Sequence, residues 1–479
     1  MFRSESLSFS AMSASAFRRI ETELSYPQFL GVPMGSTLND SLVIRFIDGH
    51  GDWRPQTRWA NRARRLWHQS LPPGPRRIPT NPLDGHILMT WERSTPRYDE
   101  MLHPVLERFE RGHCVVFYGR PDVKLAAPLG TPTIGWSDAM SYGLGPWRAE
   151  YQRCRPEWHG RLSDLCRRFD LPDGSSEGLS LDLLLASQRV AGCLQFLKRN
   201  RPSVILTEYD RNYLWSCLVL AARTMQIPTV TLVHGVMERD PIGFTPVLAD
   251  LILAWGELDR DKLVAAGEPA GKVVIGGCPR LTRDLPVTVA EGRARLGLDP
   301  LGPVVMFATS PELRCLPLVE MFCETVESMS SFAGVVRLHP SDRLETYKAI
   351  TQRHPSVLFT RHSDATLDES LAAADVVVVR GSGVGSDALV KRRPVVVINS
   401  EETLSGHDWD LVERAGCPHA RTSSELADVL GRLLCDETFR RQRATAAERY
   451  VAGFCAAFGE ESAIRIADIV EQAAARPDA

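Results

Sequence analysis

The sequence lacks the features that would place it in several common protein classes. None of its apolar runs is long enough to span a bilayer. Its 11 cysteines are scattered without a CxxC pair, which argues against structural zinc and indicates the reduced thiols of a cytoplasmic protein. It contains neither an HExxH motif nor a P-loop lysine motif, so zinc peptidases and P-loop enzymes are disfavoured. We therefore predict no metal site and no bound cofactor.

The charge balance gives no sign of a polyanionic partner. A formal net charge of −3 leaves no excess of lysine and arginine, which argues against binding to nucleic acid. Residues 1–19 are rich in serine and have no continuous apolar core, so they do not resemble a secretory signal. We expect a cytoplasmic protein, with peripheral attachment to the inner face of a membrane as an open alternative.

What the sequence does contain is a repeated alternation of strand-like and helix-like segments. Seven apolar strand-like segments lie at residues 86–91, 114–119, 131–136, 203–207, 229–234, 251–255 and 272–277. Five more follow at 303–309, 334–339, 356–360, 375–379 and 394–398. Apolar strands that alternate with helices predict parallel sheets covered on both faces. The expected fold class is α/β, with two doubly wound, Rossmann-like domains that face each other across a cleft.

The same alternation sets the expected domain boundaries. Residues 1–80 are expected to be an irregular extension that ends in a proline-rich connector. The first domain follows at 81–284 and carries a partly helical insertion at 137–180. The second domain occupies 285–436, and helices at 437–479 are expected to cross back and brace the first domain.

A glycine-rich turn in the second domain is the strongest candidate for a ligand site. The strand at 376–379 runs into Gly381-Ser382-Gly383-Val384-Gly385, and a helix is expected from about Ser386. Gly383 and Gly385 would let main-chain N–H groups approach a diphosphate, beside the positive end of that helix. The hydroxyls of Ser382 and Ser386 could donate to phosphate, and Asp387 could accept ribose hydroxyls. The alternative is an ordinary strand–helix turn in which Asp387 stabilises the helix dipole.

Two more strand ends of the second domain carry polar residues. Ligand sites of open α/β sheets lie at the carboxyl ends of the strands. Thr309 and Ser310 follow one strand and could hold a phosphate, although an N-cap explains them equally well. His339 ends the next strand and could hydrogen-bond to a leaving phosphate or, when protonated, neutralise it. Its alternative role is structural, at the start of the following helix.

Strand ends of the first domain should face the same cleft. Glu208 and Asp210 follow the strand at 203–207, and His234 ends the strand at 229–234. Transfer to a hydroxyl group needs a general base, for which we predict Asp210 first and His234 second. Helix caps and a structural histidine are the alternative. After the first strand, contacts to the acceptor could come from Glu92, Ser94 and Thr95.

Residues 203–400 resemble the two-domain glycosyltransferases of the B type, GT-B. The pieces that carry the resemblance are HGVMERD at 234–240, the segment 249–281, the HP of RLHPSD, and the segment 374–398 that holds the glycine-rich turn. The most similar members are bacterial surface-polysaccharide and capsule transferases, sialic-acid-type transferases and CDP-glycerol glycerophosphotransferases.

This resemblance implies that the second domain binds a nucleotide-sugar donor and the first domain a carbohydrate or lipid-linked acceptor. By position, His339 would contact the donor phosphate, and Ser382 to Ser386 would hold phosphate or sugar. Asp387 stands where many members have a glutamate for the ribose, and the HP pair favours a cytidine nucleotide. The implied activity is metal-independent glycosyl transfer in surface polysaccharide or glycoconjugate synthesis.

Other activities remain open. The fold also resembles the hydrolysing UDP-N-acetylglucosamine 2-epimerases, which have a similar Ser-Gly loop but paired glutamates where this chain has Ser386-Asp387. An epimerase and a CDP-glycerol-type polyol-phosphate transferase are therefore enzymatic alternatives. A catalytically inactive partner that binds nucleotide sugars is the non-enzymatic one.

Overall fold

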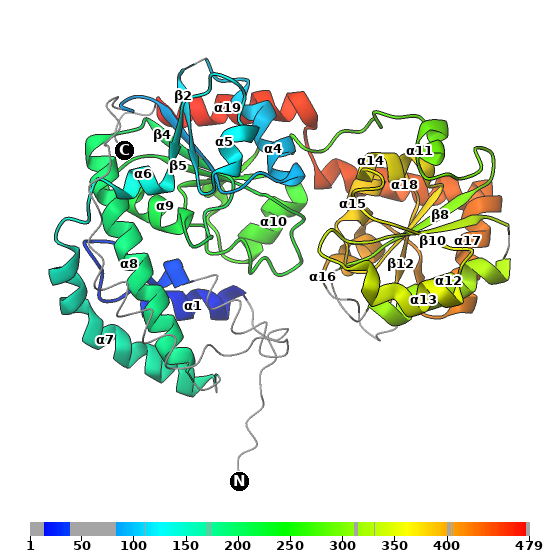
Figure 1. The fold of residues 1–479 in the computed structure, drawn as a ribbon, viewed down its shortest axis with the longest axis horizontal. Coiled ribbons are helices and arrows are strands. Elements are labelled where there is room, and N and C mark those ends of the chain that lie inside the picture. Colours follow the sequence, from blue (N-terminus) through cyan, green and yellow to red (C-terminus); the bar gives the residue numbers. More distant parts are fainter. Residues whose placement is uncertain are drawn as a thin grey trace, which may run out of the picture.

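The computed structural model describes residues 14–38, 83–110, 112–169, 171, 174–310, 315–329, 331–399, 404 and 406–475. These residues form two α/β domains, one around a seven-stranded sheet and one around a six-stranded sheet (Figure 1). Each of the twelve apolar segments contains a strand, so the predicted fold class is confirmed.

The first sheet has the order β3-β2-β1-β4-β5-β6-β7, and all neighbouring strands are parallel. Its strands are β1 (Ile87–Trp91), β2 (Cys114–Tyr118), β3 (Thr133–Gly135), β4 (Val204–Thr207), β5 (Thr229–Leu232), β6 (Leu251–Ala254) and β7 (Val273–Ile275). The strands β1, β4 and β5 are buried along their whole length, as expected for strands covered on both faces. The direction of chain progress reverses between β1 and β4.

The second sheet is also parallel, in the order β10-β9-β8-β11-β12-β13. Its strands are β8 (Val304–Ala308), β9 (Ala333–Arg337), β10 (Leu358–Thr360), β11 (Val376–Val379), β12 (Val395–Ile398) and β13 (His419–Ala420). The two residues of β13 were too few to give a recognisable apolar run. Chain progress reverses between β8 and β11, and ligands of open α/β sheets bind at the carboxyl edge beside such a reversal.

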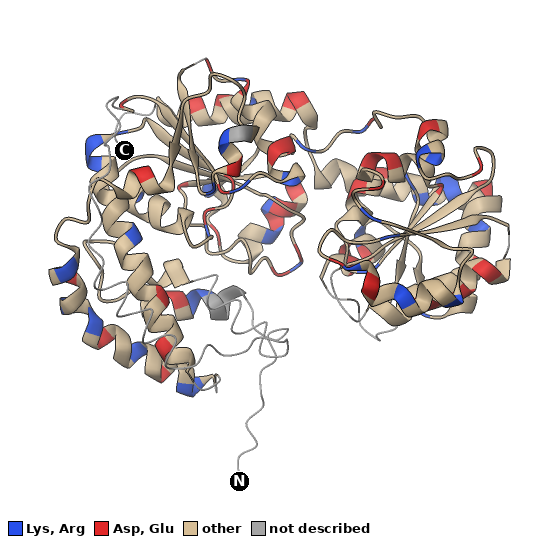
Figure 2. Ribbon diagram, in the orientation of Figure 1, with Lys and Arg blue, Asp and Glu red and all other residues tan. Residues whose placement is uncertain are grey.

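Helices cover both sheets. The first domain has α4 (Pro96–Leu106), α5 (Asp122–Ala126), α6 (Trp136–Met140), α7 (Trp147–Arg168), α8 (Ser175–Arg199), α9 (Trp215–Thr224) and α10 (Glu257–Ala265). The second has α11 (Val289–Arg295), α12 (Cys315–Met329), α13 (Lys348–Arg353), α14 (Leu367–Ala373), α15 (Val384–Val390), α16 (Gly406–Trp409) and α17 (Ser423–Cys435). Figure 2 shows acidic and basic residues interspersed over both domains. Of the helices in the described ranges, none has the length and hydropathy needed to cross a membrane.

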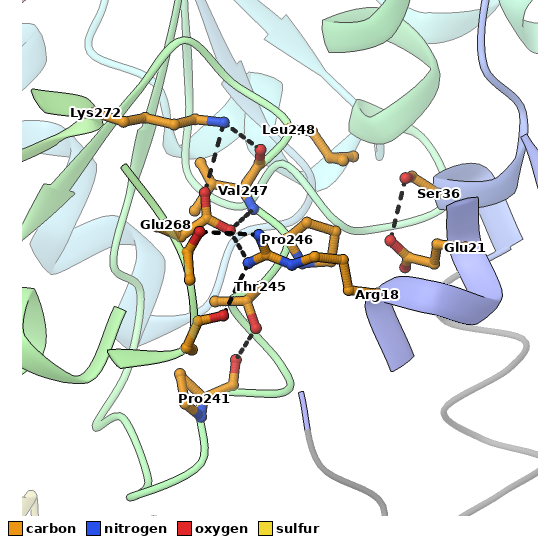
Figure 3. A network of polar contacts seen from close by, with 12 residues as sticks. Arg18, Glu21, Ser36, Pro241, Thr245, Pro246, Val247, Leu248, Glu268 and Lys272 are labelled. Atoms are coloured by element: carbon orange, nitrogen blue, oxygen red, sulfur yellow. Dashed lines mark hydrogen bonds and ion pairs between the residues drawn. The ribbon is translucent and has the colours of Figure 1, made fainter. Parts of the chain in front are cut away.

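Residues 14–38 belong to the first domain, although an irregular extension was expected there. The helix α1 (Ala14–Leu24) buries Ile20 and Leu24, whose spacing of four residues places both on one helical face. Its polar residues are also fixed, because Arg18 pairs with Glu268 at 2.7 Å. Figure 3 shows this pair in a network around the main chain of residues 245–248. In the sequence, the apolar residues of this helix extend over two helical turns or less, which is too short a pattern to predict a helix.

The C-terminal helices connect the two domains. The helix α18 (Glu437–Phe454) packs on α15 and α17 of the second domain and on α10 of the first. The helix α19 (Gly459–Ala474) lies beside α4 on the first sheet (Figure 1). It buries Ile466 and Val470 in the same core as Met89 and Trp91 of β1. The described chain therefore ends in the domain in which it begins.

Candidate active site at the domain junction

The carboxyl edges of the two sheets meet at a junction between the domains. Arg280, which follows β7, donates two hydrogen bonds of 3.1 Å to the Asp387 carboxylate of α15. Val236, which follows β5, contacts the glycine-rich turn: a Cβ placed on Gly383 would lie 3.4 Å from the Val236 Cγ2. The candidate regions of the two domains are therefore adjacent.

A buried ion pair supports this junction. The Lys262 Nζ of α10 lies 2.5 Å from the Asp410 Oδ2 of the second domain, and it also donates to the Met237 carbonyl at 2.6 Å. The two charged side chains are only 8% and 1% exposed. Charges buried to this degree must be paired, so the pair favours one arrangement of the two domains.

Hydrogen bonds fix the turn that carries His339. The Thr309 Oγ1 accepts the His339 N–H at 2.8 Å and donates to the Asp342 Oδ2 at 2.7 Å. The Ser310 hydroxyl is buried and lies 3.0 Å from the Cys315 Sγ. Thr309 therefore positions His339, and the structure turns the Ser310 hydroxyl into the second domain.

The ring of His339 is set up as a neutral hydrogen-bond donor. Its Nδ1 accepts the Ser341 N–H at 3.2 Å and lies 2.7 Å from the Ser341 hydroxyl. An accepting Nδ1 leaves the hydrogen of the neutral ring on Nε2. Burial lowers the pKa of His339, an effect that Asp342 opposes. Near pH 7 the ring is neutral and can offer the Nε2–H to an anion.

The glycine-rich turn follows β11 as predicted, but its glycines serve different purposes. Gly381 has a φ of +58°, and a Cβ there would meet no atom within 4 Å. Its N–H donates to Asp408 at 2.7 Å. Gly385 is required by packing instead, because a Cβ would lie 2.6 Å from the Leu411 Cδ1. The main chain is therefore accessible at Gly381 and Gly383, whereas Ser382 between them is buried and only 6% exposed.

The helix α15 begins at Val384, earlier than expected, and Ser386 therefore lies inside the second domain. Ser386 is fully buried, and its hydroxyl lies 3.1 Å from the His407 Nε2 and 3.0 Å from the Tyr450 hydroxyl of α18. Burial lowers the pKa of His407 to about 4, so this ring is neutral near pH 7. Ser386 joins α15 to α18, whereas a phosphate contact was expected, and the Asp387 carboxylate is occupied by Arg280 across the junction.

Glu208 follows β4 as predicted, but hydrogen-bond donors enclose its carboxylate. Its carboxylate accepts the Thr90 hydroxyl, the Glu92 N–H at 2.6 Å and the Trp215 Nε1–H at 2.8 Å. The residue is fully buried, and burial raises the pKa of its carboxyl group to about 7. Glu208 thus links β1, β4 and α9, and its side chain does not reach the junction surface.

Asp210, the first choice for the base, is also held inside the first domain. Its Oδ2 accepts the N–H groups of Leu248 and Ala249 at 2.7 and 2.9 Å. The residue is 3% exposed, and burial raises the pKa of its carboxyl group. The Asp210 side chain therefore stabilises the segment before β6, and it does not lie at the junction.

His234 is the candidate base that lies at the junction, two residues before Val236. Its ring packs between Tyr209 and Phe244, with ring centroids 4.3 and 5.0 Å away. Burial and the charge of Arg97 lower the pKa of His234 to about 3, so the ring is neutral near pH 7. Its Nδ1 is buried and has no hydrogen-bond partner among the residues that the structure describes.

The three predicted acceptor contacts separate into two groups. The Ser94 hydroxyl donates to Asp99 at 2.6 Å, and Thr95 caps α4 by accepting the Tyr98 N–H at 3.4 Å. These two residues therefore have structural partners in α4. Glu92 follows β1, and its Oε2 accepts the Asn212 Nδ2–H at 3.4 Å. Like Ser94 and Thr95, it is partly exposed.

Two arginines at the junction, Arg97 and the Arg280 described above, were not predicted from the sequence. Arg97 of α4 donates to the His234 carbonyl at 2.7 Å and crosses Gly235, where a Cβ would lie 1.7 Å from the Arg97 Nη2. Burial and the charge of Arg280 lower the pKa of Arg97. The segment that holds Arg97 was noted only for its hydroxyls and carboxylate. The described residues contain no cluster of histidine, cysteine and carboxylate side chains suited to a metal ion.

Solved structures share this architecture, although no protein-family model and no curated protein matches the sequence. The structure of MnaA from Staphylococcus aureus with UDP has a TM-score of 0.52 at 13% identity, covering 81% of this chain and 96% of MnaA. A putative UDP-N-acetylglucosamine 2-epimerase from Listeria monocytogenes has a TM-score of 0.52 at 15% identity, covering 82% of this chain and 96% of its own. This chain has the GT-B fold.

The GT-B resemblance predicted from the sequence is thereby confirmed, in the form found in the UDP-N-acetylglucosamine 2-epimerases. At these identities the similarity is one of fold. The candidate roles of individual residues in this GT-B protein rest on the geometry of the junction described above.

Proposed function

We propose that this protein is an enzyme that takes a nucleotide sugar as donor and transfers its glycosyl group to a hydroxyl acceptor. The observation that supports the proposal is the contact between the carboxyl edges of the two sheets, through Arg280 with Asp387 and Val236 with Gly383. His234 and His339 follow strands at these two edges and are neutral near pH 7, and Arg97 adds a positive charge beside His234. The similarity in fold to a protein solved with UDP favours a uridine donor over the cytidine donor expected from the sequence.

The second domain would hold the diphosphate of the donor. The His339 Nε2–H would donate to a phosphate oxygen, and the segment from Gly381 to Gly383 would allow close approach of the main chain. Arg97 would add charge from the first domain. Donors that are positioned in advance stabilise the negative charge that develops on a leaving phosphate.

His234 would act as the general base that accepts the proton of the acceptor hydroxyl. A histidine with a pKa of about 3 is neutral but only weakly basic. A bound diphosphate would compensate the charge of Arg97, which contributes to that low value, and would therefore raise the pKa of His234. We prefer His234 to Asp210 because both Asp210 hydrogen bonds go to main-chain N–H groups inside the domain.

Release of free nucleotide tests the proposed activity. The protein is incubated with UDP-, CMP-, CDP- and GDP-linked sugars, with and without hydroxyl acceptors, and nucleotide is quantified by chromatography. We expect release from one donor type that depends on an acceptor. A ligand present at 100 times its dissociation constant stabilises the folded state by about 2.7 kcal/mol, so a thermal-shift panel identifies the base. A protein that binds a nucleotide sugar but never releases nucleotide would instead be a binding partner.

Three substitutions test the assigned roles. His234→Asn should lower kcat by about two to four orders of magnitude and leave the donor KM nearly unchanged. His339→Asn should raise the donor KM, since an asparagine cannot extend as far toward the phosphate. Asp210→Asn should lower thermal stability and spare the turnover of the folded protein. Normal stability with abolished turnover in Asp210→Asn would return the role of base to this carboxylate.

The fold similarity favours one second candidate, a hydrolysing 2-epimerase. Such an enzyme would act on UDP-N-acetylglucosamine without any acceptor other than water. Appearance of UDP together with free 2-epimerised sugar, followed by proton NMR, would identify this activity and exclude the transferase.

A further inference from the structure

A pocket lined by arginines lies at the amino edge of the second sheet. It is formed by residues that precede β8, β11, β12 and β13, by the end of α15 and by one face of α18. Its volume is about 540 Å³, within the range of sites that bind small molecules. The carboxyl ends of the same strands point to the domain junction, so this pocket is separate from the candidate active site.

The lining carries six arginines and two carboxylates, an excess of four positive charges. The arginines are Arg293, Arg392, Arg393, Arg440, Arg441 and Arg443. Asp375 is occupied, because it accepts Arg293 at 2.7 Å and the Val304 N–H at 2.8 Å. Glu448 is shared between Arg392 at 3.4 Å and Arg283 at 2.8 Å. Arg441 pairs with Glu437 of the same helix at 2.5 Å. The other three arginines have no carboxylate within ion-pair distance among the described residues, so their charge is not compensated in this way.

Three of these arginines hydrogen-bond only to main-chain carbonyls among the described residues. The pairs are Arg393 with Ala372 at 3.3 Å, Arg440 with Leu434 at 3.3 Å, and Arg443 with Gly416 at 3.0 Å. A carbonyl orients a guanidinium group but does not neutralise its charge. Moreover, the Nε atoms of Arg393 and Arg443 are buried and have no hydrogen-bond partner within the described ranges. The hydrogen-bonding capacity of these two side chains is therefore not fully used by the described residues.

The remainder of the lining is largely aliphatic and includes Leu301, Leu389, Val395 and Leu433. Leu301 is 90% exposed, so a ligand bound in the pocket could cover its side chain at the rim. An occupant must therefore combine an anionic group with a body that packs on apolar side chains. Phosphate suits the anionic part, because a guanidinium group donates paired N–H bonds to it.

We propose that this pocket binds a phosphorylated small molecule with an organic body, such as a nucleoside diphosphate, at a second site. Arg440 and Arg443 of α18 contact the phosphate, and Arg393 does so from the end of α15. The aliphatic residues pack on the body of the ligand. This site does not depend on the activity proposed for the junction.

Calorimetric titration of the full-length protein with ADP and with inorganic pyrophosphate tests this site. Arg440→Gln combined with Arg443→Gln removes two charges from the pocket. Arg353→Gln combined with Arg465→Gln removes two charges from exposed positions elsewhere and is the matched control. We expect ADP affinity to fall about tenfold or more in the pocket variant and to stay within about twofold in the control.

Two further comparisons separate this site from the junction. ADP should bind more tightly than pyrophosphate, because it adds a body that packs on the aliphatic lining. His339→Asn, which alters the junction, should leave ADP affinity unchanged. If the double variant does not fold, Arg440→Gln alone serves, since this side chain is exposed and should still weaken ADP binding severalfold. Absence of ADP binding, an equal loss in the control, or a loss in His339→Asn would overturn the proposal.

Discussion

Replacing Asp410 by leucine should destabilise the protein far more than replacing its partner Lys262 by methionine. The two side chains form the buried ion pair at the domain junction, with 2.5 Å between nitrogen and oxygen. Their surroundings differ. Asp410 has a second cation, because the Arg414 Nε lies 3.1 Å from its other oxygen, without hydrogen-bond geometry. Without Asp410, Lys262 would keep its hydrogen bond to the Met237 carbonyl and the charge of Asp259, with which it forms no close ion pair.

The magnitudes follow from this asymmetry. Removing one partner of a buried ion pair costs about 3–5 kcal/mol when the remaining charge has no other partner. We expect that cost for Asp410→Leu. For Lys262→Met we expect about 2 kcal/mol, since Arg414 still compensates Asp410 and the main loss is the hydrogen bond to Met237. The double variant buries two apolar side chains and should cost no more than Lys262→Met alone, because the unpaired charge is gone.

Equilibrium unfolding in urea measures the four proteins of this double-mutant cycle. The coupling energy between the two positions should be at least about 3 kcal/mol. A matched control is Arg260→Met on the exposed side of α10, where an ion pair of half-exposed side chains should be worth under about 1 kcal/mol. Additive effects at Lys262 and Asp410, or equal costs of the two single changes, would refute the reasoning.

Three further predictions concern stability. The pKa of His407 is lowered from 6.5 to about 4, so its neutral form contributes stability above pH 6.5 that is lost as the pH falls toward 4. His407→Gln should reduce this loss by about 3 kcal/mol when the free energy of unfolding is measured from pH 7 to 4. An unchanged dependence of that free energy on pH would contradict the prediction. Gly385→Ala should cost about 1–3 kcal/mol by overpacking, whereas Gly383→Ala, with ordinary van der Waals space, should be nearly neutral in thermal denaturation; equal costs would show that space is not the reason. Glu21→Gln should cost about 3 kcal/mol in urea unfolding by removing the carboxylate that pairs with the buried Arg211 guanidinium, and a cost below about 1 kcal/mol would contradict it.

The sheets could be predicted from the sequence because each strand is a short apolar run that needs no distant information. The positions of His339 and the glycine-rich turn followed from one rule, that parallel strands end at the same edge. Both residues do lie at that edge. The direction in which a side chain points was harder to predict than its position along the chain. Starting α15 two residues earlier turns its side chains by about 200°, which carries Ser386 from the junction to Tyr450.

Other features were beyond sequence reasoning for a different reason. Lys262 and Asp410 are 148 residues apart, and neither stands in a local pattern that names the other. Asp210 looked like a base because a carboxylate after a strand often faces a ligand. Its actual partners are main-chain N–H groups of residues 248 and 249, and a sequence does not display which main-chain groups lack a partner.

The placement of α19 has a consequence for how the protein is made. Its side chains complete the core behind β1, although β1 is synthesised hundreds of residues earlier. A nascent chain that has emerged as far as the second sheet still lacks one wall of its first domain. The apolar face of the first sheet that α19 covers therefore stays partly exposed until translation has passed Ala474. Early termination would therefore destabilise the first domain, which is synthesised first. For the same reason, the two halves cannot be obtained as independent folding units by cutting the chain between the sheets.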